Sequence, residues 1–238
     1  MRAIIVADGG APTRAALDAA WPGWDVPCDL VVGADGGAAT AVALGLRPGL
    51  VVGDADSLPA ADLERLRDAG VPVELSSVDK DETDTELAIA AAILRGATVV
   101  AILGALGGRR VDHALANVAL LAHPAWSGID VSIVDPSARI RLLAAPAPGG
   151  GPAWIALEGR VGDTVSLVPL GQDAEGVTTA GLRYPLADGT LAFGPARGVS
   201  NVRTAVHASV SVRRGRLLVV ESPAHLASPP LPSPGGVS

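Results

Sequence analysis

Short apolar runs and longer, alanine-rich segments alternate along the chain as far as residue 134. The apolar runs end in glycine or aspartate and predict buried strands, whereas the longer segments carry the caps and glycine stops of helices. Strands are predicted at 3–7, 30–32, 50–52, 71–75, 98–103 and 129–134, and helices at 13–20, 38–44, 59–69, 83–95 and 112–121. This alternation predicts an α/β fold, in which a parallel sheet has helices on both faces.

The pattern changes near residue 144, and a proline- and glycine-rich stretch at 145–152 predicts a linker. Beyond it, short apolar runs at 154–157, 164–168, 190–193, 204–212 and 217–221 replace the helical segments. Valine or alanine takes every second position from Val206 to Val212, which is typical of a half-buried strand. We therefore expect an α/β domain over 1–145, a small all-β sandwich over 152–222 and a disordered, proline-rich tail over 223–238.

Acidic residues follow several predicted strands of the first domain, and they are Asp35, Asp54, Asp56, Asp81 and Asp84. Because ligands of such folds bind outside the carboxyl ends of the strands, we expect these side chains to line one site. Crowded carboxylates repel each other unless a cation lies between them, and Mg²⁺ binds such oxygens together with substrate phosphates. A Mg²⁺–nucleotide site is one interpretation, and a set of ordinary acidic turns and helix caps is the other.

Glycines and a lysine near these aspartates also suit an anionic ligand. Gly36 and Gly37 follow Asp35 at the start of a predicted helix, where backbone N–H groups can bind an anion or a ribose. A plain tight turn explains the same residues equally well. Lys80 stands inside the second acidic cluster, where it either neutralises phosphate or pairs with an acidic neighbour.

A second glycine-rich segment, 104–117, contains two adjacent arginines before a predicted helix. Arg109 and Arg110 can each bind a phosphate through two N–H groups. Asp112 either contributes to the site or caps the helix, and His113 acts as a base, as a phosphate donor or as a structural residue.

Composition narrows the classes of function. The 238 residues carry a net charge of −7 without a basic run, which argues against a nucleic-acid groove. The single cysteine, Cys28, excludes an intrachain disulfide and a cysteine-based zinc site. The apolar N-terminal run is too short for a signal peptide, and no run reaches the roughly 18 apolar residues of a membrane span. We expect a cytoplasmic protein with small-molecule ligands and with neither nucleic-acid nor membrane partners.

Several segments, in this order and spacing, resemble one protein family. In the first domain they are Ala34-Asp35-Gly36-Gly37-Ala38, Gly53-Asp54-x-Asp56-Ser57-Leu58, Asp79-x-Asp81-x-Thr83-Asp84 and Gly107-Gly108-Arg109-Arg110-x-Asp112-His113-x-x-x-Asn117. In the second domain they are Thr178-Thr179-x-Gly181-Leu182-x-Tyr184-x-Leu186, Leu191-x-Phe193-Gly194 and Ser200-Asn201. Over nearly its whole length except the tail, the chain is similar to the thiamine pyrophosphokinase (thiamine diphosphokinase) family.

The resemblance implies an activity and an assembly. Members of the family transfer the diphosphoryl group of ATP to the hydroxyl of thiamine, which gives thiamine diphosphate and AMP. They join an α/β nucleotide-binding domain to a β-sandwich and act as homodimers, with thiamine held between the subunits. We therefore expect an ATP-dependent diphosphokinase that requires Mg²⁺ and has ATP and thiamine as substrates.

The resemblance also implies roles for individual residues. Asp54, Asp56 and Asp84 would hold Mg²⁺, and with Asp81 they form the expected catalytic group. The residue patterns described above and the resemblance together give the expected ATP contacts: Asp35, Gly36, Gly37, Lys80, Asp81, Arg109, Arg110, Asp112 and His113. Tyr184 falls where the family places an aromatic ring over thiamine, with Ser200 and Asn201 nearby.

The chain departs from the family pattern at two places. Ala55 stands between Asp54 and Asp56 where an aromatic residue is usual. The arginine segment is one residue longer than the common Gly-Gly-Arg-x-Asp spacing, so either Arg109 or Arg110 matches the family's arginine. Two other functions stay open at this point: a diphosphokinase acting on a hydroxymethylpterin, and a non-catalytic nucleotide sensor on the same fold.

Overall fold

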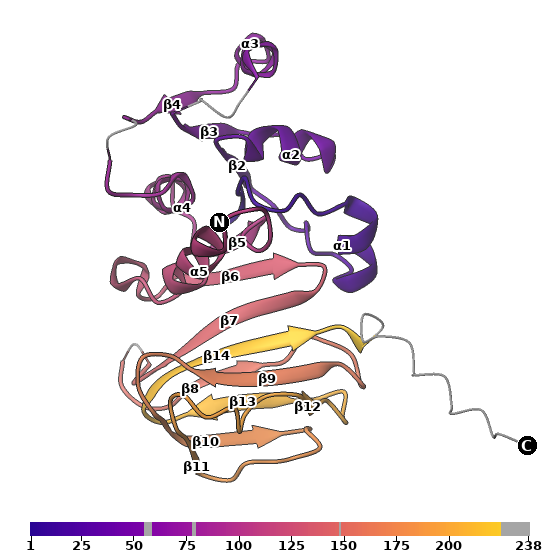
Figure 1. The fold of residues 1–238 in the computed structure, drawn as a ribbon, viewed down its shortest axis with the longest axis vertical. Coiled ribbons are helices and arrows are strands. Elements are labelled where there is room, and N and C mark those ends of the chain that lie inside the picture. The colour runs from indigo at the N-terminus through magenta and orange to yellow at the C-terminus, as the bar shows by residue number, and fades with distance from the viewer. Residues whose placement is uncertain (55–58, 78–79, 148, 225–238) are drawn as a thin grey trace, which may run out of the picture.

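The structure, a computed structural model, describes residues 1–54, 59–77, 80–147 and 149–224 (Figure 1). Its first part alternates strands and helices as predicted: β1 (Arg2–Val6), α1 (Arg14–Ala20), β2 (Leu30–Ala34), α2 (Gly37–Ala43), β3 (Leu50–Gly53), α3 (Ala60–Asp68), β4 (Val73–Leu75), α4 (Asp84–Leu94), β5 (Val99–Leu103), α5 (Val111–Leu120), the 3-10 turn η1 (Pro124–Trp126) and β6 (Asp130–Asp135). Within the described ranges, no helix combines the length and the apolar character that crossing a bilayer requires.

Two predicted helix starts are confirmed by side-chain caps. Thr13 Oγ1 accepts a hydrogen bond from the Ala16 N–H, and Thr83 Oγ1 accepts one from the Glu86 N–H, both at 3.2 Å. Such caps satisfy N–H groups that the first helical turn leaves without partners. Thr83 thereby fixes the start of α4 and places Asp84 at its first position.

The strands of the first part form a parallel sheet in the order β6-β5-β1-β2-β3-β4. Ile4 and Ile5 of β1 are both fully buried, as expected for a strand covered on both faces. Ile5 packs in the core that includes Ile89 of α4, whereas Ile4 packs with Leu17 of α1. The loops after β1, β2, β3 and β5 therefore all emerge at one edge of the sheet.

In the second part of the chain the described elements are strands: β7 (Ala138–Ala145), β8 (Ala153–Ala156), β9 (Thr164–Pro169), β10 (Ala174–Ala180), β11 (Gly189–Leu191), β12 (Asn201–Val202), β13 (Ser209–Val212) and β14 (Gly215–Ser222). β7, β14, β9 and β12 extend the parallel sheet with antiparallel pairs, so that this sheet has ten strands in the part of the chain that is described. The remaining strands form a smaller sheet in the order β11-β10-β13-β8.

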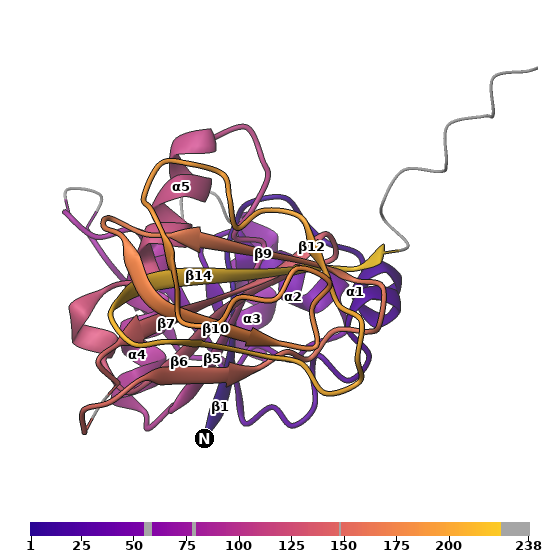
Figure 2. The same ribbon diagram turned by 90° about the horizontal axis from the view of Figure 1, so that it is seen from below.

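The two sheets of the second part stack face to face and confirm the predicted sandwich (Figures 1 and 2). Leu167, Leu217 and Val219 of the larger sheet and Val177 and Val210 of the smaller one fill the space between them. β7 ends at residue 145 and pairs with β6 on one side and with β14 on the other, so the larger sheet runs through both predicted domains, and the boundary between them stays a prediction. Most of the predicted tail, 225–238, lies outside the described residues.

The strands of the second part differ from the sequence predictions in several places. β7, β10 and β12 were not predicted, whereas the stretch expected to be a linker begins where β7 ends. The strand predicted at 204–212 starts at Ser209, and Val206 is 73 % exposed outside it. Arg203 explains the difference, because its guanidinium donates hydrogen bonds to the carbonyl oxygens of Ala205 and Val206 and holds that segment out of the sheet.

Candidate active site

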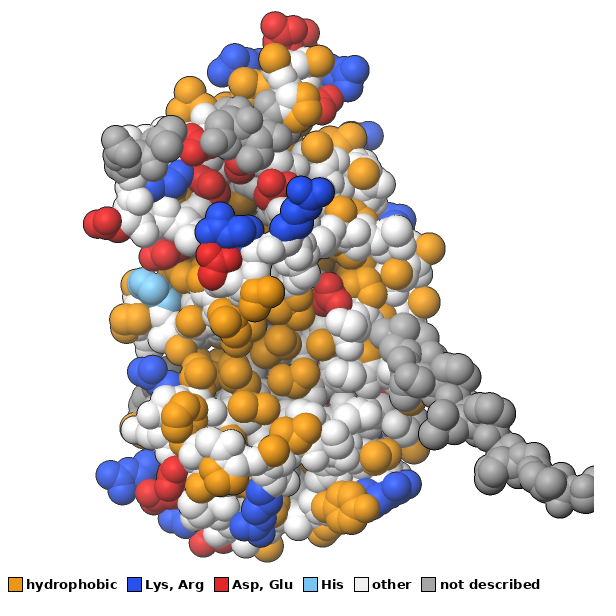
Figure 3. Space-filling model, viewed as in Figure 1, with side chains coloured by type: hydrophobic (Ala, Val, Ile, Leu, Met, Phe, Trp, Pro, Cys, Tyr) orange, Lys and Arg blue, Asp and Glu red, His pale blue; other side chains and the backbone are white. Residues whose placement is uncertain are grey.

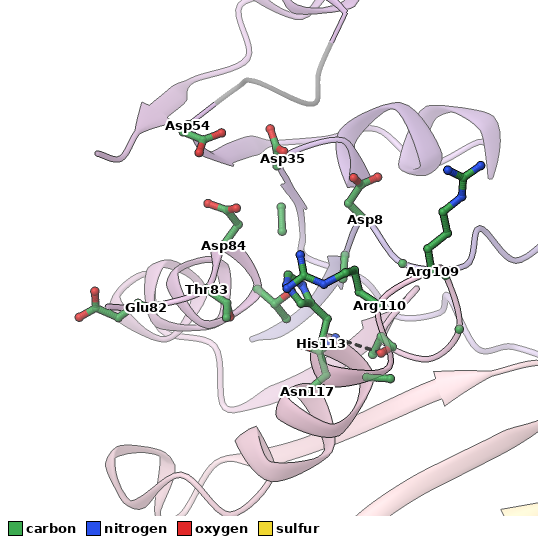
Figure 4. Close-up of a pocket in the computed structure, with 18 of the residues that line it drawn as sticks. Asp8, Asp35, Asp54, Glu82, Thr83, Asp84, Arg109, Arg110, His113 and Asn117 are labelled. Carbon is green, nitrogen blue, oxygen red and sulfur yellow. Dashed lines mark hydrogen bonds between the residues drawn. The ribbon is translucent and has the colours of Figure 1, made fainter. Parts of the chain in front are cut away.

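A cavity of about 580 Å³ opens at the edge of the sheet where β1, β2, β3 and β5 end (Figure 4). This volume suits a small-molecule ligand. All of its lining residues lie between Ala7 and Asn117, at the ends of these strands or in the loops after them, in the segment before α4, and in α4 and α5. The cavity brings together most of the site residues predicted in the first domain: Asp35, Asp54, Lys80, Asp81, Asp84, Arg109, Arg110 and His113.

One side of the cavity is acidic and contains a single lysine among the described residues. Asp54 directly follows β3, and Asp84 begins α4 on the facing side (Figure 4). Lys80 Nζ lies 2.5 Å from Asp84 Oδ1 and 2.6 Å from Ser76 Oγ, with the lysine side chain 14 % exposed. Of the two interpretations for Lys80, the structure shows pairing with an acidic neighbour.

The predicted metal ligands are only partly covered by the structure. Asp54 and Asp84 line the cavity, whereas Asp56 lies outside the described residues. Among the residues that are described, no three His, Cys, Asp or Glu side chains gather closely enough to hold a metal ion. Magnesium binding therefore stays a prediction that rests on hard carboxylate oxygens facing a common cavity.

Asp35 and the two glycines after it are held by close backbone packing. Asp35 is 6 % exposed and adopts a left-handed conformation, with φ of +49°. A Cβ on Gly37 would lie 1.9 Å from the Val6 carbonyl oxygen, so only glycine lets α2 start this close to β1. The tight approach explains Gly37 without a ligand, and neither Gly36 nor Gly37 lines the cavity. Their proposed contact with ATP stays a prediction.

The two arginines of the glycine-rich segment differ in their partners. Arg110 donates to Asp112, with Nε 2.9 Å from Oδ1 and Nη2 2.6 Å from Oδ2. These hydrogen bonds lower the pKa of Asp112 to about 2 and raise the pKa of Arg110. Arg109 makes no hydrogen bond or ion pair with any residue that the structure describes. Asp112 thus holds Arg110 and does not cap α5, whose start has no side-chain cap within the described chain.

Asp8 and Asn117 line the cavity, although no role was predicted for them from the sequence. Asp8 follows β1 and lines the cavity beside Gly9. It could have been found by the rule that identified the other aspartates, because it too comes directly after an apolar run. Asn117 belongs to one of the motifs that resemble the family, but it was assigned no function. Its Nδ2 donates to the Ala105 carbonyl at 2.9 Å and ties α5 to the loop after β5.

Two family descriptions match this chain. "Thiamin pyrophosphokinase, catalytic domain" matches residues 25–133, which include most of the cavity lining. "Thiamin pyrophosphokinase, vitamin B1 binding domain" matches residues 155–217, which include most of the sandwich. The chain belongs to the thiamine pyrophosphokinase family.

Individual members of the thiamine pyrophosphokinase family are similar over most of their length. The chain is 26 % identical to thiamine pyrophosphokinase from Bacillus subtilis over 193 residues, which are 81 % of this chain and 87 % of that protein. The crystal structure of the Bacillus subtilis protein has a TM-score of 0.78, with 25 % identity over 94 % of this chain and 99 % of that one. The crystal structure of thiamin pyrophosphokinase from Geobacillus thermodenitrificans has a TM-score of 0.74 and 28 % identity, and the match covers 93 % of this chain and 97 % of that one.

The residues predicted to contact thiamine lie in the vitamin B1-binding domain and do not line the cavity. Tyr184 is 65 % exposed. The Asn201 side chain accepts from the Tyr184 N–H at 3.0 Å and donates to the Tyr184 carbonyl at 2.7 Å. Ser200, with φ of +62°, donates its N–H to Ser166 Oγ at 3.1 Å. In this structure Asn201 therefore holds the Tyr184 backbone, and its contact with thiamine stays a prediction.

Proposed function

We propose that this chain is a cytoplasmic thiamine diphosphokinase that transfers the diphosphoryl group of ATP to the hydroxyl of thiamine, with thiamine diphosphate and AMP as products. The observation that carries this proposal is the joint match of one chain to a thiamin pyrophosphokinase catalytic domain and a vitamin B1-binding domain. The second match favours thiamine over a hydroxymethylpterin. The retained aspartates of the cavity favour an enzyme over a sensor.

The donor set of the cavity fits Mg²⁺, because this ion is bound by one or two carboxylates together with substrate phosphates. Asp54 and Asp84 are the proposed ligands within the described residues, and Asp56 is a third proposed ligand. When bound, Mg²⁺ would neutralise charge on the phosphate oxygens as the diphosphoryl group moves. Asp35 and Asp81 line the same cavity as proposed ATP contacts, and Asp81 is also a proposed catalytic residue.

Transfer of this kind asks a protein mainly to align its substrates and to balance their charge. Arg110 suits the polyphosphate, because Asp112 occupies its Nε and Nη2 atoms and fixes the direction of the guanidinium. Figure 4 shows the Arg110 side chain directed into the cavity between α4 and α5. His113 lines the cavity next to it as a further proposed ATP contact. Lys80 supplies positive charge beside Asp84.

The Arg110–Asp112 pair predicts that removing the charge of Asp112 has the same effect on ATP binding across a wide range of pH. The pKa of Asp112 is lowered to about 2, so its carboxylate stays ionised at neutral and mildly acidic pH and is protonated only as the pH falls towards that value. Asp112→Asn should therefore weaken ATP binding by roughly threefold at every pH from about 5 to about 8, as measured by titration calorimetry. An effect that vanishes on acidification within this range would show that Asp112 titrates there.

We propose further that the active enzyme is a homodimer. The cavity is lined by residues of the first domain, whereas Tyr184, Ser200 and Asn201 belong to the second and lie elsewhere on the same chain. Each described chain thus carries a nucleotide-type cavity without its thiamine-type residues. A second copy that places its Tyr184 against this cavity would complete the site under two-fold symmetry.

An apolar face of the larger sheet supports this assembly (Figure 3). α4 covers one face of the sheet over β1, β2 and β3. On β7, β14 and β9 the neighbouring residues Leu142, Leu218 and Val168 lie on the same face, where Leu218 is buried and Val168 is 37 % exposed. Val111 and Leu115 of α5 add exposed side chains, at 71 % and 67 %. Apolar surface of this kind is typical of a protein–protein interface.

Tyr184 offers a direct test of the thiamine assignment. Thiamine carries a cationic ring, and an aromatic face stabilises such a cation by roughly 1–2 kcal/mol. Tyr184→Ala should therefore raise the KM for thiamine about tenfold and leave the KM for ATP unchanged, as measured by steady-state kinetics. Tyr184→Phe, which keeps the ring, serves as the control. Equal KM values in the alanine variant and the wild type would make Tyr184 a structural residue of the sandwich.

The reaction itself is tested by AMP release. Purified protein is mixed with ATP and Mg²⁺, and AMP is measured with thiamine, with a hydroxymethylpterin and with no acceptor. The proposal predicts AMP only with thiamine. Release with the pterin alone would identify the other diphosphokinase, and binding of ATP without release in any mixture would identify a sensor.

A further inference from the structure

A second cavity, of about 310 Å³, lies at the opposite edge of the parallel sheet from the active-site cavity. Arg2, Val99 and Asp130, the first residues of β1, β5 and β6, line it, and it shares no lining residue with the active-site cavity. The segment 22–27 after α1 adds further lining residues, and Glu158 adds one from beyond β8. Both predicted domains therefore contribute to this second cavity, whose volume suits a small molecule.

The floor of the second cavity is polar, although an apolar core lies on each side of it. Arg139 and Arg141 stand two residues apart on β7 and therefore point to the same face of the larger sheet, next to Ser132 of β6. On β1 and β5 this face packs in the core beneath α1, and on β14 and β9 it packs in the sandwich. The two arginines thus lie between the cores of the two predicted domains.

The nitrogen atoms of these two arginines are only partly satisfied. Arg141 Nη2 donates to Glu221 Oε2 at 2.6 Å, and Arg141 Nη1 lies 3.2 Å from Glu158 Oε1. Arg139 Nη1 donates to the other carboxylate oxygen of Glu158. The Nε atoms of both arginines are buried and have no hydrogen-bond partner among the described residues. Buried donors without an acceptor are unfavourable and rare, so these two point to a ligand that supplies one.

Glu158 is the weakly held member of this group. Its side chain is 56 % exposed, whereas those of Arg139 and Arg141 are mostly buried. Glu221 is 1 % exposed by contrast, and it accepts the N–H groups of Glu158 and Gly159 at 2.8 and 2.9 Å. An ion pair with an exposed partner adds little stability, so another oxyanion can replace the Glu158 carboxylate on the arginines at little cost.

Arg2 adds a third positive charge to the lining. Its guanidinium donates to the carbonyl oxygens of Trp24 at 2.7 Å and Pro27 at 2.9 Å, and it forms no ion pair with a described residue. Asp130, exposed at the start of β6, is the other carboxylate of the lining. When Glu158 turns towards solvent and Glu221 stays paired with Arg141, two positive charges face one negative charge, which favours an anion.

We propose that the second cavity binds a small organic oxyanion, whose carboxylate or phosphate group takes the place of the Glu158 side chain on Arg139 and Arg141. Pro22 and Val26 are exposed and give the cavity an apolar wall for the rest of the ligand. A bound anion connects the two predicted domains, because both line the cavity. This inference is independent of the proposed function, since the two cavities share no residue.

Four probes test the proposal by titration calorimetry at constant ionic strength. Benzoate and phenyl phosphate carry an apolar ring, whereas acetate and inorganic phosphate present the same oxyanion groups without one. Each ringed probe should bind the wild type at least about tenfold more tightly than its ringless counterpart, because the ring packs on the apolar wall. Comparison of benzoate with phenyl phosphate shows which of the two oxyanion groups the arginines prefer.

Two variants should change the affinity for benzoate in opposite directions. Arg139→Gln should weaken binding at least about tenfold, because it removes a charged donor from the oxyanion. Glu158→Gln keeps all three arginines and removes the competing charge, so it should tighten binding about threefold. A general loss of structure would weaken binding in both variants. Thermal melting of each variant establishes that it is folded.

Matched controls make the same charge changes outside the second cavity. Arg213 and Glu175 form exposed ion pairs with Asp188 and Arg214 on the sandwich, so Arg213→Gln and Glu175→Gln should leave the affinity for benzoate unchanged. Arg110→Ala should also leave it unchanged, because Arg110 lines the active-site cavity.

Several results would contradict the proposal. Benzoate binding that Arg110→Ala abolishes and Arg139→Gln leaves intact would place the anion in the active-site cavity. Equal affinities for the ringed and ringless probes would exclude an organic ligand. An unchanged affinity in Glu158→Gln would exclude the exchange of carboxylates, and this variant decides the matter even if Arg139→Gln does not fold. If none of the four probes binds saturably to the wild type or to Glu158→Gln, the second cavity is not an anion site.

Discussion

Replacing Asp84 with asparagine is expected to lower the turnover number by at least about a hundredfold at saturating ATP, thiamine and Mg²⁺. Asp84 faces the cavity from the first position of α4 and is a proposed ligand of Mg²⁺. A carboxylate that holds the metal stabilises charge that develops during transfer, whereas the neutral amide of asparagine keeps the shape and loses this charge. Steady-state AMP release is the measurement.

Glu86→Gln is the matched control for Asp84→Asn. Glu86 stands in the same first turn of α4 but does not line the cavity, and its Oε1 lies 3.5 Å from His123 Nε2. Both substitutions remove one negative charge from the N-terminus of the helix, which costs similar stability. Turnover close to the wild-type value in Asp84→Asn at saturating Mg²⁺ would exclude Asp84 from the metal site.

Mixing two impaired variants is expected to restore activity. If Asp84 of one subunit and Tyr184 of the other serve one site, each mutant homodimer has two damaged sites. A mixed dimer has one site with both lesions and one with neither. Random pairing makes half of the dimers mixed, so about a quarter of wild-type activity should return under two-fold symmetry. The assay uses thiamine below its wild-type KM, where the Tyr184 lesion is strongest.

The experiment unfolds Asp84→Asn and Tyr184→Ala together and refolds the mixture, with each variant refolded alone as a control. Native mass spectrometry counts the mixed dimers. Activity equal to the mean of the two controls, in a sample that contains mixed dimers, would place both residues in a site within one subunit. A sample that stays monomeric and is active would contradict the proposed assembly.

The sequence predicted the parallel half of the fold because its strands are buried on both faces and therefore read as continuous apolar runs. β7 escaped prediction for the opposite reason. Arg141 is 7 % exposed inside this strand, where it pairs with the buried Glu221 at 2.6 Å. A charged residue at an inward position breaks the apolar pattern, and only its distant partner makes the burial favourable. Nothing near Arg141 in the sequence indicates that partner.

β10 was not predicted because it contains Glu175 and Gly176, and both residue types have low strand propensity. Its strand conformation depends on its neighbours β11 and β13. The strands of the second half that were not predicted therefore depend on partners that are distant in the sequence.

For the site, the rule that ligands lie beyond the strand ends correctly grouped Asp35, Asp54, Asp81 and Asp84 around one cavity. It could not distinguish Arg109 from Arg110, because their spacing to the flanking motif is ambiguous by one residue. The structure separates them through a side-chain contact, the pairing of Arg110 with Asp112. Asp56 lies outside the described residues, and its predicted role is unchanged.

Transfer of a whole diphosphoryl group is tested most directly by following the β-phosphorus of ATP. The protein is incubated with Mg²⁺, thiamine and ATP that carries ³²P at the β-position, and the products are separated by chromatography. The proposed function predicts label in thiamine diphosphate and unlabelled AMP, in equal molar amounts. Label retained in ADP, with thiamine carrying a single phosphate or none, would contradict it.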